Sequence, residues 1–320
     1  MAEEAQQTAS PEPSSPFRAD ALAGRVVLVT GGATGIGFGC CKAFGQHGAK
    51  VAMMSRRKPV IDEAVAKLQA LGVDAFGVQG DVRDFAKCEA ACNAVAQHFG
   101  RLDFLINNAA GNFVVPAEAL SPNAFATVLG IDLQGCFHMS KAALPHLKRT
   151  GPSDGAVIIN ITATLQDHAT PFQTHAASAK AGIDVLTNTL GVEWGEYGIR
   201  TIGLAPGGIS GTVGGPGGRV FGGAGKDGVS VESRASDPAP QDLRRKGVPA
   251  GRWGRVDDIA LAAVFACSSA AGWITATRLT IDGGSCHPLS RGFPDAKRFI
   301  MRKSADEKKN FKGGVGRAKL

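Results

Sequence analysis

A glycine-rich turn near the start of the chain constrains the fold more than any other feature. Residues 25–30, RVVLVT, form a short valine-rich run typical of central parallel strands. Glycines follow within residues 31–37, and a helix-forming segment then extends to Gly48. Strand, glycine turn and helix in this order predict a dinucleotide site, with a purely structural turn as the alternative, because backbone N–H groups there can bind a pyrophosphate. The residues expected to contact the dinucleotide are Gly31, Thr34, Gly35, Ile36 and Gly37.

Short apolar runs alternate with helical segments through the rest of the chain. The further expected strands are at 50–55, 71–80, 102–107, 156–162, 199–205 and 278–281. This alternation predicts one α/β domain over residues 21–290, a Rossmann-type doubly wound parallel sheet of about seven strands flanked by helices. Ligands of such sheets bind at the carboxyl ends of the strands.

Three consecutive cations follow the second expected strand. Arg56, Arg57 and Lys58 stand together, and there is no Asp or Glu between Val51 and Ile61. An acidic residue here would bind the adenosine ribose of NAD, whereas arginine suits the 2′-phosphate of NADP. The sequence therefore predicts NADPH/NADP+ as the cofactor, with Arg56 the first and Arg57 the second candidate. A solvated charge cluster is the alternative.

The two ends of the chain differ in composition from the expected domain. Residues 1–20 are polar and rich in Pro and Ser, which predicts a disordered leader that is neither a signal nor a transit peptide. Residues 291–320 hold 10 Lys and Arg against 3 Asp and Glu, so this tail accounts for the net charge of +7. Because the excess lies in a tail rather than on a folded face, nucleic acid is not a predicted partner.

Apolar runs and cysteine spacing exclude two further classes of protein. No run of about 18 apolar residues occurs, so no membrane-spanning helix is predicted. The seven cysteines include no C-x-x-C pair, and no His or further Cys completes a zinc set around Cys88 and Cys92. Free buried thiols are the expectation, and no metal site is predicted.

Residues 160–182, NITATLQDHATPFQTHAASAKAG, resemble the catalytic segment of the short-chain dehydrogenase/reductase family. Lys180 is present, but Ala176 and Ala163 occupy the usual Tyr and Ser positions, and the only tyrosine is Tyr197. The resemblance implies that Lys180 binds the nicotinamide ribose. The other cofactor contacts that it implies are Asp81, Val82, Asn108, Ala109, Pro206, Gly207, Ile209 and Thr212.

Five motifs resemble one branch of that family, the 2,4-dienoyl-CoA reductases of peroxisomal type. They are NITATL, AAGNF, ID at 131–132, SAKAG and APGGISGT. The resemblance implies NADPH-dependent reduction of 2,4-dienoyl-CoA to trans-3-enoyl-CoA in the β-oxidation of unsaturated fatty acids. Hydride would add to C5, and a water held by Asp132 and Lys180 would protonate Cα. Asn112 and the Thr162/Thr164 region are candidate donors for the developing negative charge.

The substrate carries phosphates, so its site is expected to show cations near the pocket mouth. The substrate contacts that the resemblance implies are Arg56, Arg83, Phe113, Ser121, Pro122, Asn123 and Arg219.

A glycine-rich segment follows the sixth expected strand. Of the 22 residues from 207 to 228, 11 are glycine. Residues 206–240 are predicted to form a substrate lid, with an idle insertion as the alternative.

Two other functions remain open at this stage. One is a trans-2-enoyl-CoA or 3-oxoacyl reductase, and the missing tyrosine counts against the latter. The other is a non-catalytic NADP-binding regulator, against which Asp132 and Lys180 argue. A histidine could also replace the tyrosine. His175 is expected to point elsewhere because it lies about 100° around the helix from position 176, whereas His168 lies in a loop that can approach.

The last three residues, Ala318, Lys319 and Leu320, resemble the Ser-Lys-Leu address of peroxisomal proteins. They predict a peroxisomal import receptor as a partner and the peroxisome matrix as the location, with the cytosol as the alternative. The family resemblance further implies a homotetramer assembled through helices at 121–149 and 173–196.

Overall fold

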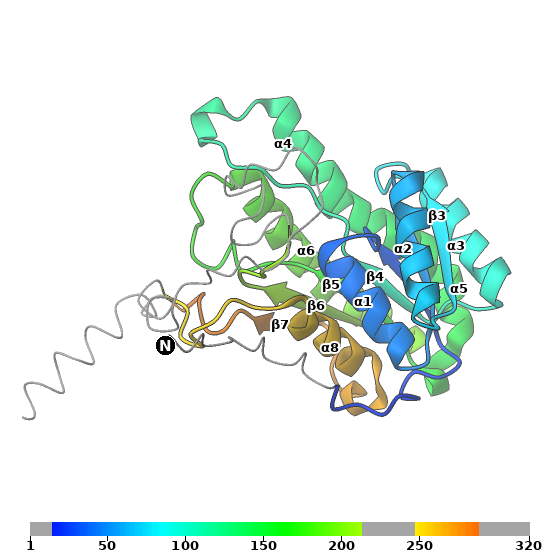
Figure 1. Cartoon of the computed structure of the whole chain (residues 1–320). Helices are drawn as coiled ribbons and strands as arrows, with labels where there is room; N and C mark the ends of the chain where they lie inside the picture. Colours follow the sequence, from blue (N-terminus) through cyan, green and yellow to red (C-terminus); the bar gives the residue numbers. More distant parts are fainter. Residues whose placement is uncertain (1–14, 213–246, 288–320) are drawn as a thin grey trace, which may run out of the picture.

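A parallel sheet runs through the part of the chain that the computed structural model describes, residues 15–212 and 247–287 (Figure 1). Its seven strands lie in the order β3-β2-β1-β4-β5-β6-β7, and each neighbouring pair is parallel. The strands are β1 (Val26–Thr30), β2 (Lys50–Ser55), β3 (Ala75–Gln79), β4 (Phe104–Asn107), β5 (Ala156–Ile161), β6 (Ile199–Pro206) and β7 (Thr277–Ile281). The predicted fold class is confirmed.

Helices cover both faces of the sheet because successive side chains of a strand point to opposite faces. In β1, Val27 and Val29 enter the core formed with α1, α2 and α8, whereas Val26 and Leu28 enter the core formed with α3, α5 and α6. The longer helices are α1 (Gly35–Gln46), α2 (Lys58–Ala70), α3 (Phe85–Phe99), α4 (Pro122–Leu129), α5 (Gly135–Asp154), α6 (Thr174–Glu193) and α8 (Val256–Cys267).

The segment expected as one helix at 121–149 is interrupted. Helix α4 passes into a single π-helical turn, η2 (Gly130–Gln134), before α5 begins, and α5 continues to Asp154. Gly135 begins α5 close to the segment that follows β3, since a Cβ there would lie 2.6 Å from Val82 Cγ2. Turns of this type occur frequently at functional sites, and this one contains Asp132.

A buried polar bridge joins the two strands at the centre of the sheet to the helices behind them. Asn107 Nδ2, at the end of β4, donates to Asn160 Oδ1 of β5 at 2.9 Å and to Ser140 Oγ of α5 at 3.0 Å. Asn160 Nδ2 donates to Thr187 Oγ1 of α6 at 2.9 Å. Since hydrogen bonds are strong in a low-dielectric interior, the bridge fixes α5 and α6 relative to the strand ends.

The direction of winding reverses between β1 and β4, which are neighbours although β2 and β3 lie between them in sequence. In doubly wound sheets this switch point leaves a crevice at the carboxyl ends of the strands. All seven cysteines are free, and six of them are buried. Among the described helices, none has the length and apolar character needed to cross a membrane.

Candidate active site

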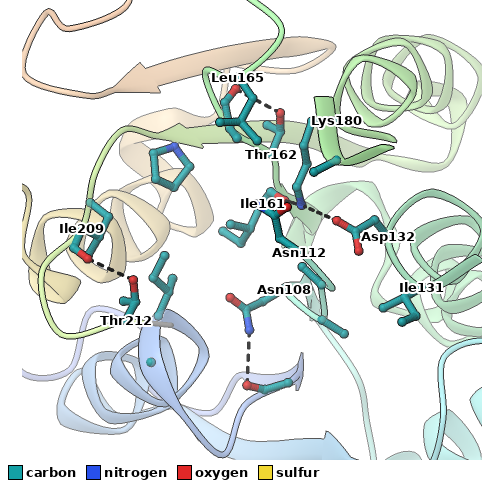
Figure 2. A pocket seen from close by; sticks show the side chains of 18 of the residues that line it. Asn108, Asn112, Ile131, Asp132, Ile161, Thr162, Leu165, Lys180, Ile209 and Thr212 are labelled. Carbon is teal, nitrogen blue, oxygen red and sulfur yellow. Dashed lines mark hydrogen bonds and ion pairs between the residues drawn. The ribbon is translucent and has the colours of Figure 1, made fainter. Parts of the chain in front are cut away.

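A cavity of about 710 Å³ opens at the carboxyl ends of the strands (Figure 2). Fifteen of the sixteen residues predicted to contact the cofactor line it, and Gly37 is the exception. The fifteen are Gly31, Thr34, Gly35, Ile36, Arg56, Arg57, Asp81, Val82, Asn108, Ala109, Lys180, Pro206, Gly207, Ile209 and Thr212.

The glycine turn between β1 and α1 fits a dinucleotide pyrophosphate. Gly35 has φ +54°, a conformation that favours glycine, and it opens toward Thr212. A Cβ at Gly37 would lie 2.4 Å from the Gly31 carbonyl oxygen, so glycine there lets α1 pack against the turn. The side chain of Thr34 makes no capping hydrogen bond, which leaves the first-turn N–H groups of α1 for a ligand.

Positive charge gathers where β2 and β3 end. Arg56 and Arg57 follow β2 and line the cavity, and Asp81 follows β3. Arg83 does not line the cavity, because its guanidinium pairs with Asp81 (Nη2–Oδ2 2.6 Å). The hydrogen bond from Arg83 lowers the pKa of Asp81, and the charge of Arg56 adds to the effect.

Asp132 and Lys180 meet on the cavity wall as a buried ion pair, with Nζ 3.4 Å from Oδ2. Asp132 is 2% exposed and Lys180 8%. Lys180 Nζ donates to the Ile161 carbonyl at 3.0 Å, and the Gly111 N–H donates to Asp132 Oδ1 at 2.7 Å (Figure 2 shows the ammonium between Ile161 and Asp132).

The environment of Asp132 shifts its proton affinity. Burial raises the pKa of Asp132 above its usual range, although the Lys180 charge and the Gly111 N–H oppose the shift. Oδ2 accepts no hydrogen bond from the described residues. A carboxyl with a raised pKa and an oxygen that accepts no hydrogen bond is suited to exchanging a proton with a ligand or a water in the cavity.

No tyrosine hydroxyl enters the site. Ala163 and Ala176 line the cavity beside Lys180, at the positions where the family places Ser and Tyr. Tyr197 lies in η3 (Gly195–Tyr197), where the Lys148 ammonium sits 3.4 Å from its ring centroid. Tyr197 does not line the cavity.

The two histidines near this segment differ in position. His168 lines the cavity, and its Nε2 lies 3.3 Å from Thr170 Oγ1. His175 is buried against the Phe113 ring, with centroids 4.2 Å apart, and does not line the cavity. Burial lowers the pKa of His175.

Most of the predicted substrate residues lie outside the cavity wall. Phe113 stacks on His175, and Ser121 Oγ accepts the Ala124 N–H at the start of α4, where Pro122 and Asn123 are also exposed. Among the members of this set that the structure describes, Arg56 alone lines the cavity. Arg219, most of the proposed lid at 206–240 and the tail with Ala318, Lys319 and Leu320 lie outside the described residues.

Several cavity residues were missed by the sequence analysis. Val248 and Trp253 reach the cavity because a bridge between Ile209 and Gly254 brings their segment beside the end of β6, and no local pattern indicates this contact. Gln173 also lines the cavity. The only sequence signal for Gln173 is that it lies one helical turn before Ala176, which places both side chains on the same face.

The raised pKa of Asp132 predicts a pH-dependent stability that the Asp132→Asn variant lacks. Because its folded-state pKa exceeds the unfolded value, the native protein binds more protons than the unfolded chain between the two values. The free energy of unfolding, relative to that of the variant, should therefore fall as pH rises through this window, by at most about 1.4 kcal/mol per pH unit. Urea unfolding of both proteins across this pH range measures the difference, and a difference that stays flat or rises would contradict the assignment.

The comparisons with known proteins agree with this geometry. A family model described as short chain dehydrogenase matches residues 25–215. The (3E)-enoyl-CoA-producing peroxisomal 2,4-dienoyl-CoA reductase of Arabidopsis thaliana is 42% identical over 94% of this chain and 97% of its own length. The protein of the same description from Rattus norvegicus is 38% identical over 91% and 93%.

A solved structure shows that the likeness extends from the sequence to the three-dimensional fold. The 3-ketoacyl-(acyl-carrier-protein) reductase from Brucella melitensis, complexed with NADH, aligns with a TM-score of 0.72 at 28% identity. The alignment covers 83% of this chain and 100% of that one. Fold, glycine turn and relatives together establish that the chain belongs to the short-chain dehydrogenase family.

Proposed function

We propose that this chain is an NADPH-dependent 2,4-dienoyl-CoA reductase that forms a trans-3-enoyl-CoA. One observation carries the proposal: the cavity holds a buried Asp132–Lys180 pair, with alanines where carbonyl reducers have hydroxyls. Such a site lacks the usual acid for a carbonyl oxygen but retains a proton donor for carbon. The names of the plant and rat relatives support the same substrate and product.

The proposed reaction transfers one hydride and one proton. When bound, NADPH supplies the hydride to C5 of the dienoyl thioester. The C4=C5 electrons then form a C3=C4 bond, the C2=C3 electrons form C1=C2, and the carbonyl pair moves to oxygen. Protonation at C2 restores the carbonyl and leaves the 3-enoyl product.

Asp132 and Lys180 are proposed to deliver that proton through a water. The Ile161 carbonyl holds the ammonium, and the Gly111 N–H holds one carboxylate oxygen, so the second oxygen can bind the water. Burial strengthens both interactions and raises the pKa of the carboxyl toward the range useful for proton transfer. Lys180 also faces the cavity where the nicotinamide ribose is proposed to bind.

NADPH is proposed over NADH because Arg56 and Arg57 line the cavity at the end of β2. The coenzyme A part of the substrate is proposed to contact Arg56, Arg83, Phe113 and the start of α4 at Ser121, Pro122 and Asn123, with Arg219 as a further candidate. These residues carry cations, an aromatic face and a helix N-terminus, which suit phosphates and adenine.

A homotetramer and a peroxisomal location are also proposed. Phe137 on α5 and Val185 and Val192 on α6 are large exposed apolar side chains on the helices expected at the interface. Sedimentation equilibrium tests the assembly, and a monomer at micromolar concentration would refute it.

The relatives' names support the peroxisome as the location. The test is whether a fluorescent fusion of this protein loses its import into peroxisomes when Ala318, Lys319 and Leu320 are removed.

The substrate assay compares two acyl-CoA esters. The wild-type protein should oxidise NADPH with hexa-2,4-dienoyl-CoA and much less with crotonyl-CoA, because the second double bond places the hydride acceptor at C5. Absorbance measures NADPH loss, and NMR of the product locates the remaining double bond. Absence of dienoyl-dependent oxidation would overturn the proposed function, and faster turnover of crotonyl-CoA would favour an enoyl-CoA reductase.

Removing either member of the buried pair should lower kcat. Asp132→Ala and Lys180→Ala are each expected to reduce kcat by about 100-fold or more, because the proton to Cα loses its donor. Asp62→Ala is the matched control, since Asp62 forms an exposed ion pair with Lys58 on α2. Circular dichroism verifies folding, and wild-type kcat in both variants would remove the pair from the mechanism.

Removing the Arg56 guanidinium should affect one cofactor more than the other. Arg56→Ala is expected to raise KM for NADPH about 10-fold or more and KM for NADH much less, because only NADPH carries the 2′-phosphate. Arg149→Ala, on the exposed face of α5, is the control. Equal changes for the two cofactors would refute the role of Arg56 in phosphate binding.

A further inference from the structure

The described cavity contains a buried amide donor that the proposed chemistry has not yet used. Gln173 is 1% exposed and lines the cavity with Asp132 and Lys180. Its Oε1 accepts the Asn112 Nδ2–H at 2.6 Å, which fixes the direction of the amide. Its Nε2 has no hydrogen-bond partner among the described residues. A buried N–H without a partner is costly, so its presence in a ligand cavity indicates that a ligand accepts the bond.

The surrounding backbone holds this amide in place. Gln173 immediately precedes α6, and its carbonyl accepts the Ala177 N–H at 2.9 Å. Phe172, just before it, has φ +64°, a left-handed conformation that costs about 1–3 kcal/mol in a non-glycine residue. The Val115 N–H bonds the Phe172 carbonyl at 3.0 Å, so the segments after β4 and β5 are joined twice, once by backbone and once by the Asn112–Gln173 pair.

Other candidate donors near the same wall are already engaged. The Thr162 hydroxyl donates to Asp184 Oδ1 at 2.8 Å, and the Asn112 amide donates to Gln173. The Lys180 ammonium bonds Ile161 and pairs with Asp132. Ala176, one turn along α6 from Gln173, carries no polar group. The Gln173 N–H is therefore a buried donor of this wall that can bond an oxygen of the substrate.

We infer that Gln173 Nε2 donates a hydrogen bond to the thioester oxygen of the dienoyl substrate and stabilises the negative charge that develops there. This inference rests on the proposed function. After hydride adds to C5, the electron pair displaced along the chain resides on that oxygen, and it returns when Cα takes its proton. A fixed donor in a buried site stabilises this charge more than the neutral ester, which lowers the barrier. Asn112 is a positioning residue because it acts through Gln173.

The first experiment separates kcat from cofactor binding. Gln173→Met keeps the length of the side chain and removes the donor, and it should lower kcat about 10- to 100-fold with hexa-2,4-dienoyl-CoA. The Kd for NADPH should remain within about 2-fold of wild type, because the amide does not contact the cofactor in this assignment. Gln97→Leu, an exposed glutamine on α3, is the matched control.

A second variant keeps the test valid if Gln173→Met does not fold. Gln173→Glu retains the shape and the oxygen that accepts from Asn112, but at neutral pH its carboxylate cannot donate. The inference predicts a loss of kcat with little change in the Kd for NADPH, and wild-type kcat in this variant would contradict it. Thr164→Val tests another hydroxyl of the cavity wall, and a loss of kcat confined to Thr164→Val would overturn the assignment to Gln173.

A spectroscopic measurement reports the hydrogen bond itself. With NADP+ in place of NADPH no turnover occurs, and a donor on the carbonyl oxygen should shift the ultraviolet band of bound hexa-2,4-dienoyl-CoA to longer wavelength. The shift should be present in wild type and Gln97→Leu and reduced in both Gln173 variants. If wild type oxidises no NADPH with the dienoyl ester, the proposed function fails. If wild type is active and the Gln173 variants keep both kcat and the shift, only this inference fails.

Discussion

The buried Asp132–Lys180 ion pair imposes the strictest requirement on the structure around it. Removing two charges from water costs several kcal/mol per ion, and their attraction offsets this only when further hydrogen bonds satisfy the pair. The Ile161 carbonyl supplies one of those bonds from the end of β5, and the Gly111 N–H supplies the other from the segment after β4. The pair thus depends on the strand register, which the Asn107–Asn160 bridge holds, and on the π-helical turn η2 that contains Asp132.

The fold and the residues that line the cavity around the glycine turn could be predicted because their signals are local. A strand, a glycine turn and a helix are contiguous in sequence, and the physics of phosphate binding acts within that stretch. The Arg56–Arg57 pair was found for the same reason, since it directly follows β2. The segment 160–182 likewise predicted that Lys180 lies at the cavity, because the strand, loop and helix that position it are contiguous in sequence.

The rest of the cavity wall could not be predicted to the same extent because it is assembled from distant segments. Trp253 reaches the cavity only through the Ile209–Gly254 bridge. Gln173 acquires its direction from Asn112, which lies 61 residues earlier in the chain. The π-helical turn was missed as well, because residues 121–149 have a helical pattern and no local signal marks the break at Gly130–Gln134.

The absence of a catalytic tyrosine separates two tasks that one hydroxyl performs in carbonyl reduction. When a carbonyl is reduced, charge develops on the same oxygen that takes the proton, so one acid can serve both needs. In a conjugated thioester the charge develops on oxygen, but the proton goes to carbon. A strong acid at the oxygen would trap an enol, whereas a neutral amide stabilises the charge without giving up a proton. The proposed roles of Gln173 at the oxygen and of the Asp132–Lys180 pair at the carbon match this division. Gln173 immediately precedes α6, Asp132 lies in η2 and Lys180 lies within α6, so the two tasks are assigned to different side chains.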